Sequence, residues 1–285
     1  MRYYWGVSIS RPVTRIFGAV GAVALLAVGA DFGLAIHAER NLANRIREEM
    51  NLPADPYVRL GGAAYASSFF TGKWSSIQVR ARDLEIDNFG LVSVESGAVD
   101  VEVPPSAVWS GDFKDGFTER YHTTLQLDGL SLGRQFDFTD LAIQNHEDIS
   151  PAGGWETEAI FEATPPGWSA PAEVVVKLRI VRGDAKFIPV EVISGPEGPD
   201  SKDVRRGREL SDDAIDAILP AFELELTGAE LPLRQRPTRI YVSGGSVFIE
   251  GDELFRTVSP EDFLPVATHD PELGGETDRG DDSSQ

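Results

Sequence analysis

Cysteine is absent from the 285-residue sequence, which excludes disulfide bonds, thiolate metal sites, cysteine nucleophiles and a lipid anchor attached to cysteine. Basic residues are few. The chain has 26 lysines and arginines against 46 aspartates and glutamates, a formal net charge of −20. Binding to a phosphate backbone needs a surplus of basic residues. The composition therefore predicts that nucleic acid is not a partner.

The sequence also lacks the motifs of the common enzyme classes. It contains no His-Glu-x-x-His, Gly-x-Ser-x-Gly, Gly-x-Gly-x-x-Gly or Walker-type loop. Its 4 histidines are scattered, without a second histidine or an acid at ligand spacing. Acidic pairs such as Asp137 with Asp140 are expected by chance in so acidic a chain, and no spacing marks the two carboxylates of a glycoside hydrolase. We therefore expect no catalytic activity, no cofactor and no metal ion.

The amino end combines a basic flank with a long apolar run. Arg2, Arg11 and Arg15 precede residues 16–30, which carry no charge, and the apolar character resumes after Asp31. A basic flank before an apolar run is typical of an export signal whose basic side stays in the cytoplasm. The remainder of the chain is therefore expected outside the cytoplasmic membrane.

Two fates of this segment stay open. Residues 28–30, Val-Gly-Ala, form an acceptable cleavage site, and the uncharged run is short for a span. If Asp31 reaches the outer interface, the run extends to residue 36 and is long enough for an uncleaved anchor. We expect residues 1–36 to be a cytoplasmic flank and a signal-anchor of a single-pass protein, with a cleaved and secreted form as the alternative.

An amphipathic helix is predicted directly after the apolar run, over residues 37–50. Ala38, Leu42, Ile46 and Met50 recur at every fourth position and so share one helix face. Pro53 disfavours helix in the residue before it and ends the segment. We interpret this helix as a packing helix or stalk. A membrane-surface helix is the alternative, against which its mixed charge argues.

Period-two alternation dominates residues 74–193 and is typical of β-strands. The alternation slips by one residue near Arg82 and Asp83, which predicts a β-bulge there. Phe136 and Phe138 look like a continuation of the strand pattern. Pro189, inside another strand candidate, suggests an edge or bulged position.

The last third of the chain adds a helix, a hairpin and a tail. Ser211 offers capping chemistry to a helix that stops at Pro220. Gly244 and Gly245 separate two strand candidates and predict a tight hairpin. Acidic and small residues dominate from residue 268, as in a solvated tail. We therefore expect a β-rich ectodomain over residues 37–267 and an acidic disordered tail over 268–285.

Several segments, in their order along the chain, resemble one known family. They are residues 58–62 (Val-Arg-Leu-Gly-Gly), 69–74 (Phe-Phe-Thr-Gly-Lys-Trp), 77–84, 210–214 and 240–249. In this order they resemble the LmeA-like family of actinobacterial cell-envelope phospholipid-binding proteins, over roughly residues 20–265. The resemblance implies an α+β fold, mostly antiparallel, in which a strongly curled sheet wraps a helix as in tubular lipid-binding domains.

The same resemblance implies a membrane-tethered, extracytoplasmic phospholipid-binding protein that supports maintenance of the envelope and its mannan or lipoglycans. Its partners would be phospholipid acyl chains, the cytoplasmic membrane and envelope glycosyltransferases. The alternative hypothesis is an adaptor ectodomain that scaffolds those glycosyltransferases without a bound ligand. A continuous apolar cavity would favour the first hypothesis, and a core filled by side chains would favour the second.

Apolar strand faces are the predicted contacts for the lipid. An apolar concave sheet can hold acyl chains, and each buried methylene contributes about 0.8 kcal/mol. Aromatic residues just before the first clear strand would either plug the core or form the rim of the lipid site. The predicted apolar lining consists of Phe69, Phe70, Trp74, Ile77, Val79, Val174, Val176, Leu178 and Ile180.

Overall fold

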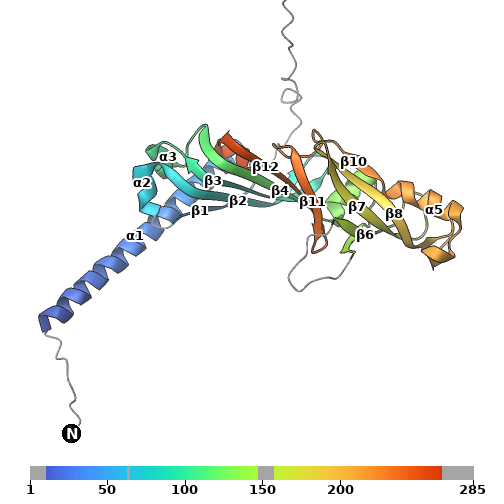
Figure 1. The fold of residues 1–285 in the computed structure, drawn as a ribbon, viewed down its shortest axis with the longest axis horizontal. Coiled ribbons are helices and arrows are strands. Elements are labelled where there is room, and N and C mark those ends of the chain that lie inside the picture. Colours follow the sequence, from blue (N-terminus) through green and yellow to red (C-terminus); the bar gives the residue numbers. More distant parts are fainter. Residues whose placement is uncertain (1–10, 63–64, 147–156, 265–285) are drawn as a thin grey trace, which may run out of the picture.

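The computed structural model describes residues 11–62, 65–146 and 157–264, and the tail predicted over 268–285 lies outside them. Two six-stranded sheets follow one another along an elongated molecule, and a long helix projects from one end (Figure 1). The shorter helical segments lie at the two ends and between the strands.

Helix α1 (Arg11–Glu49) is divided into an exposed half and a packed half. Side chains 19–30 are exposed, whereas Ala38, Leu42 and Ile46 are buried against the sheet. The segment Ala19–Glu49 is long and apolar enough to cross a membrane, with a mean hydropathy of 2.1 in its most apolar part. The amphipathic helix predicted to continue from the apolar run is thus confirmed, and the run and the helix form one unbroken element.

Sheet A contains the strands nearest to α1. Its order is β1 (Tyr57–Gly61), β2 (Lys73–Ile86), β3 (Gly90–Glu102), β4 (Gly116–Leu127), β12 (Ser246–Val258) and β11 (Pro237–Ser243), and all neighbours are antiparallel. The chain leaves this sheet after β4, builds the second sheet, and returns as β11 and β12. Sheet A therefore combines strands from the first half of the chain with strands from its last part.

Sheet B forms the far end of the molecule. Its order is β10 (Leu224–Leu226), β8 (Asp184–Pro196), β7 (Ala172–Val181), β6 (Glu158–Ala163) and β5 (Ala142–Asn145), with β9 (Val204–Arg206) also paired to β8. All these pairs are antiparallel as well.

The remaining elements are short helical turns. They are η1 (Tyr65–Ser67), α2 (Ser68–Thr71), α3 (Pro105–Ser110), α4 (Gly129–Gly133), η2 (Arg134–Phe136), η3 (Gly207–Glu209), α5 (Asp212–Ile218), η4 (Leu219–Phe222) and η5 (Pro260–Phe263). The capped helix predicted after Ser211 is α5, because the Ser211 hydroxyl accepts the N–H of Ala214 at 3.2 Å.

Local irregularities of the strands follow the sequence closely. The β2–β3 register shifts between Ala81 and Leu84, and Asp83 has a φ of +55°, so the predicted bulge is confirmed. Gly244 and Gly245 both have positive φ, as a tight hairpin turn requires, and they join β11 to β12. The β7–β8 register also shifts opposite Pro189, which confirms the bulged position.

The strand expected to run through Phe136 and Phe138 is wrong. The Asp128 carboxylate accepts the N–H of Leu130 at 3.0 Å and of Ser131 at 2.8 Å, which starts α4 instead. Phe136 then ends η2, and both phenylalanines are buried from a turn rather than from a strand face. The alternating phenylalanines suit a strand, but the Asp128 cap starts a helix before them in the chain, and the residues that follow continue in helical turns.

Two apolar cores lie on the same inner face of sheet A. In the helix core, the packed half of α1 covers one end of that face, with Leu42, Ile46, Trp74, Ile77 and Val79 fully buried. In the intersheet core, sheet B covers the other end. This core includes Leu125 and Ile249 of sheet A, Phe161, Val174 and Phe187 of sheet B, and Phe222 of η4.

The α+β class with mostly antiparallel strands is confirmed. The stronger prediction, a strongly curled sheet that wraps a helix, is not confirmed. In the described residues both sheets are open, with β1 and β11 at the edges of sheet A. Sheet A lies along α1 over the packed half of the helix (Figure 1).

Candidate functional site

The residues predicted to contact lipid fall into three places. Trp74, Ile77 and Val79 lie in the helix core, and Val174, Val176 and Leu178 lie in the intersheet core with Ile180 packed against it. Phe70 on α2 is 88% exposed, and the side chain of Phe69 is not among those described. The structure therefore does not gather these residues around one site. It places most of them on two cores that share one sheet.

The two cores meet along the inner face of sheet A at a polar row. Ser96 of β3 pairs with Thr123 of β4, which pairs with Gly251 of β12, and all three belong to the inward-facing set of their strands. The hydroxyls of Ser96 and Thr123 are hydrogen-bonded at 3.0 Å, and both side chains are buried. We call this row, together with Gln235 beside Gly251, the seam.

Gln235 is the most unusual residue of the seam. Its side chain is only 6% exposed, and neither its Nε2 nor its Oε1 atom has a hydrogen-bond partner within the described chain. The absence of a side chain at Gly251 makes room for it, since a Cβ there would lie 3.0 Å from the Cβ of Gln235. Leaving a buried polar group unpaired costs roughly 1–3 kcal/mol. The Gln235 amide thus keeps a donor and an acceptor that no described group of the protein uses.

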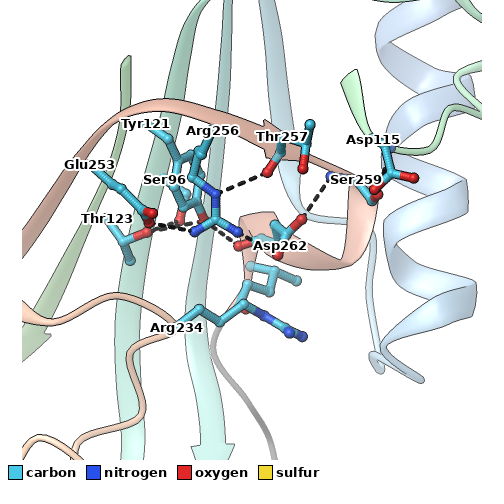
Figure 2. A network of polar contacts seen from close by, with 11 residues as sticks. Ser96, Asp115, Tyr121, Thr123, Arg234, Glu253, Arg256, Thr257, Ser259 and Asp262 are labelled. Carbon is cyan, nitrogen blue, oxygen red and sulfur yellow. Dashed lines mark hydrogen bonds and ion pairs between the residues drawn. The ribbon is translucent and has the colours of Figure 1, made fainter. Parts of the chain in front are cut away.

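A polar network fastens the end of the described chain over this region (Figure 2). The Asp262 carboxylate of η5 accepts the N–H of Ser259 at 2.7 Å and pairs with Arg256 at 3.3 Å. The Tyr121 hydroxyl donates to the Asp262 carbonyl, and the Arg256 guanidinium lies 4.9 Å from the Tyr121 ring centre. Burial raises the pKa of Tyr121, so this hydroxyl remains a donor at physiological pH. Arg234, next to Gln235, donates to the Leu264 carbonyl at 3.1 Å.

A surface hollow of about 620 Å³ opens where the two cores meet at the edge of sheet A. We call it the notch. The first residues of β1 and the loop before it form one side, and β2 with its bulge forms the other. Leu84 packs against both cores, and Leu52 packs against the helix core. The lining comprises Leu52, Pro53, Ala54, Asp55, Pro56, Tyr57, Arg59, Gln78, Arg80, Ala81, Arg82, Asp83 and Leu84.

A second hollow, of about 710 Å³, lies on the outer face of sheet A. Its charged side chains are paired across strands, Arg120 with Asp252 and Arg239 with Glu250. The Arg120 guanidinium lowers the pKa of Asp252, while burial, followed by the hydrogen bond to Glu250, raises the pKa of Tyr241 to about 12. These mutual pairs bind the strands together, as expected for cross-strand contacts on a solvated face.

The packed half of α1 begins at Asp31, where the membrane-crossing segment can end. The Asp31 carboxylate accepts the N–H of Tyr65 at 2.9 Å and of Ala66 at 2.6 Å. Residues 11–30 span about 30 Å as a helix, which matches the hydrocarbon thickness of a bilayer. The exposed Phe70, five residues after Tyr65, lies on α2, which contacts η1. Asp31 thus ties the segment of Tyr65 and Ala66 to α1 directly after the apolar part of the helix.

Sequence reasoning missed the seam and the notch as sites. Ser96 and Thr123 interrupt apolar alternation without any motif, and Gln235 precedes a strand in a segment without periodicity. The bulge at Arg82 and Asp83 was the available signal for the notch. A bulge changes which side chains of a strand face the core and often marks the place where regular pairing ends.

Comparison with known proteins identifies the family. A search of curated proteins and a search of solved structures gave no match. The family model for LmeA-like phospholipid-binding proteins matches residues 29–252, from the end of the apolar segment to β12. This match covers both sheets and the packed half of α1. The chain belongs to the LmeA-like phospholipid-binding family.

Proposed function

We propose that this protein is a membrane-tethered, extracytoplasmic phospholipid-binding protein of the actinobacterial envelope, and that it acts without catalysis. The observation that carries the proposal is the family match over residues 29–252. In this proposal the exposed half of α1 is the uncleaved anchor, and Arg2, Arg11 and Arg15 stay on the cytoplasmic side. Bound lipid would then serve maintenance of the envelope and its mannan or lipoglycans.

The physical basis of binding would be burial of acyl chains against sheet A. Each methylene removed from water contributes about 0.8 kcal/mol, so ten of them contribute about 8 kcal/mol. The apolar inner face is shared between α1 and sheet B, and the seam lies between the two covers. We propose that sheet A is the wrapping sheet of a tubular lipid-binding arrangement and that α1 is the wrapped helix, with Trp74, Ile77 and Val79 as chain contacts and Phe70 at the rim.

One observation favours the adaptor hypothesis. The predicted lining residues of both cores, Val174, Val176 and Leu178 as well as Trp74, Ile77 and Val79, have no exposed surface and pack among other side chains. Of the predicted residues whose side chains are described, none lines either of the two hollows. A core filled by side chains at these positions suits a scaffold for envelope glycosyltransferases, and this remains the second candidate function.

Native mass spectrometry of the full-length chain, extracted from membranes in a mild non-ionic detergent, tests the two functions. The expected result is a population that carries one phospholipid mass per chain and retains it at collision energies that strip detergent. A single-span membrane protein of unrelated fold, purified in parallel, is the control for lipid retained by the anchor. Equal lipid retention by that control would reject the lipid-binding function and leave the adaptor.

A further inference from the structure

The notch exists because β1 is shorter than the strand beside it. Tyr57, the first residue of β1, pairs with Arg80 of β2, whereas β2 continues through the bulge to Ile86. Along this continuation, the described chain places β3 on one side of β2 and no strand on the other. The edge of the sheet is therefore interrupted at the bulge, next to Leu84, which packs against both cores.

The rim of the notch carries positive charge. Its lining contains three arginines against two aspartates, although the chain as a whole has a net charge of −20. Arg80 is held by Glu95 at 2.6 Å, and Asp55 is held by Arg47 at 2.6 Å. Arg59 and Arg82 are exposed, and within the described chain neither forms an ion pair or a side-chain hydrogen bond. Within the described chain, two guanidinium groups and the Asp83 carboxylate thus form no ion pair, and the unpaired charge of the rim remains positive.

The inner side of the notch is apolar. Ala81 is buried in the helix core, and Leu84 is partly buried and touches both cores. Leu52, which follows the end of α1, lines the same hollow and packs against the helix core. A volume of about 620 Å³ lies in the range of sites for small ligands. The hollow therefore joins an arginine rim to the apolar side chains of Leu52, Ala81 and Leu84.

We propose that the notch binds one phospholipid, with Arg59 and Arg82 on its phosphate and an acyl chain entering beside Leu84. The inference rests on the proposed lipid-binding function and adds the place and the residues. Guanidinium groups suit phosphate because they form paired, charge-assisted hydrogen bonds with its oxygens. The apolar side chains beside the arginines make an amphiphile the matching ligand, since a free anion would leave Leu52 and Leu84 uncovered.

The main test compares two double variants of the full-length chain in detergent micelles. Arg59→Gln with Arg82→Gln removes the charge at the notch. Arg182→Gln with Arg206→Gln removes the same charge from two exposed arginines, one in the β7–β8 turn and one in β9, that form no ion pair with the described residues. Dioleoyl phosphatidylglycerol, dioleoylglycerol and inorganic phosphate are added in separate titrations, and native mass spectrometry or fluorescence quenching gives the apparent Kd.

The notch variant is expected to bind phosphatidylglycerol at least about tenfold more weakly than the wild type, because two charge-assisted contacts are lost. Its affinity for dioleoylglycerol, which has no phosphate, and its melting temperature should not change, because both side chains are exposed. The sheet B variant should bind like the wild type. As a second arm, Leu84→Trp should weaken binding of both lipids by filling the opening.

Each other result overturns the inference in a distinguishable way. If the wild type binds phosphatidylglycerol and the notch variant binds it equally well, the lipid-binding function stands and the notch is not its site. Equal losses in both double variants would mean that binding follows net charge alone. Inorganic phosphate bound as tightly as phosphatidylglycerol would make the notch a general anion site. A wild type that binds neither lipid would reject the proposed function itself.

Discussion

The helix core and the intersheet core bury the same face of sheet A in different ways. The buried rings of the intersheet core are phenylalanines packed edge-on or stacked, such as Phe136 against Phe138 at 5.4 Å and against Phe187 at 5.6 Å. The helix core has two phenylalanines as well, Phe113 and Phe263, but its other buried rings, Tyr65, Trp74 and Tyr121, carry polar atoms. The Trp74 indole donates to the Tyr65 hydroxyl at 3.2 Å, and that hydroxyl donates to the Val108 carbonyl at 2.9 Å.

The two cores therefore contribute differently, one mainly to the stability of the fold and the other mainly to the orientation of α1. Burial of apolar surface is non-directional and stabilises sheet B against sheet A wherever the volumes fit. Hydrogen bonds are directional and so fix the orientation of the groups they join. Helix α1 makes several of them, including one in which the N–H of Leu60 donates to Glu39 Oε1 at 2.9 Å. The helix core therefore sets the orientation of sheet A relative to α1, while the intersheet core supplies a large share of the apolar burial.

The largest effect is expected from Phe161→Ala. Phe161 has no exposed surface and contacts the rings of Phe136 and Phe187. Removing the ring from a closely packed core should lower the free energy of unfolding by about 3–5 kcal/mol. Urea denaturation followed by circular dichroism measures it. A loss below about 1 kcal/mol would show that the intersheet core is loosely packed and is not the main source of stability.

A smaller effect is expected when one residue of each core is enlarged to tryptophan. Val176 lies in the intersheet core, and Val79 lies in the helix core opposite Ser96 of the seam. Overpacking should cost about 1–3 kcal/mol in either variant. Only Val79→Trp should also lower the lipid content seen by native mass spectrometry, since Val79 borders the seam. Lipid lost from Val176→Trp alone would place the acyl chain between the sheets.

The smallest effect, and one of opposite sign, is expected for Gln235→Leu in the lipid-free protein. The substitution replaces an unpaired buried amide with an apolar group of similar size, so the free energy of unfolding should rise by about 1 kcal/mol. Chemical denaturation with and without added phosphatidylglycerol measures the change. A decrease in the lipid-free protein would mean that the amide is already satisfied by water. Gln235→Glu, which keeps the shape but adds charge, serves as the control.

Much of the local structure was predictable because it depends on neighbouring residues. The slip at Arg82, the Gly244-Gly245 turn and the helix face of Leu42 and Ile46 all follow from short-range patterns. The assignment of strands to two cores was not predictable. Val79 and Val176 show the same alternation, and only pairing across distant strands decides whether α1 or sheet B covers them.

The seam and the notch depend on register to an even greater degree. Ser96, Thr123 and Gly251 come from three strands, and they form a row only once β12 returns to pair with β4. The notch needs β1 to begin opposite Arg80, which no pattern within β1 specifies. Phe136 shows the reverse case, in which an apolar spacing suggested a strand although the Asp128 cap had already started a helix.

The unbroken course of α1 sets a reach for the protein. From residue 30 to Glu49 the helix rises about 28 Å, and the notch opens beside Leu52, just after its end. One leaflet of a bilayer is about 15 Å of hydrocarbon. With α1 close to the membrane normal, a phospholipid held in the notch would have left its leaflet completely while the protein remained inserted. In that arrangement, the length of α1 would set the distance from the membrane surface at which the protein holds a single lipid.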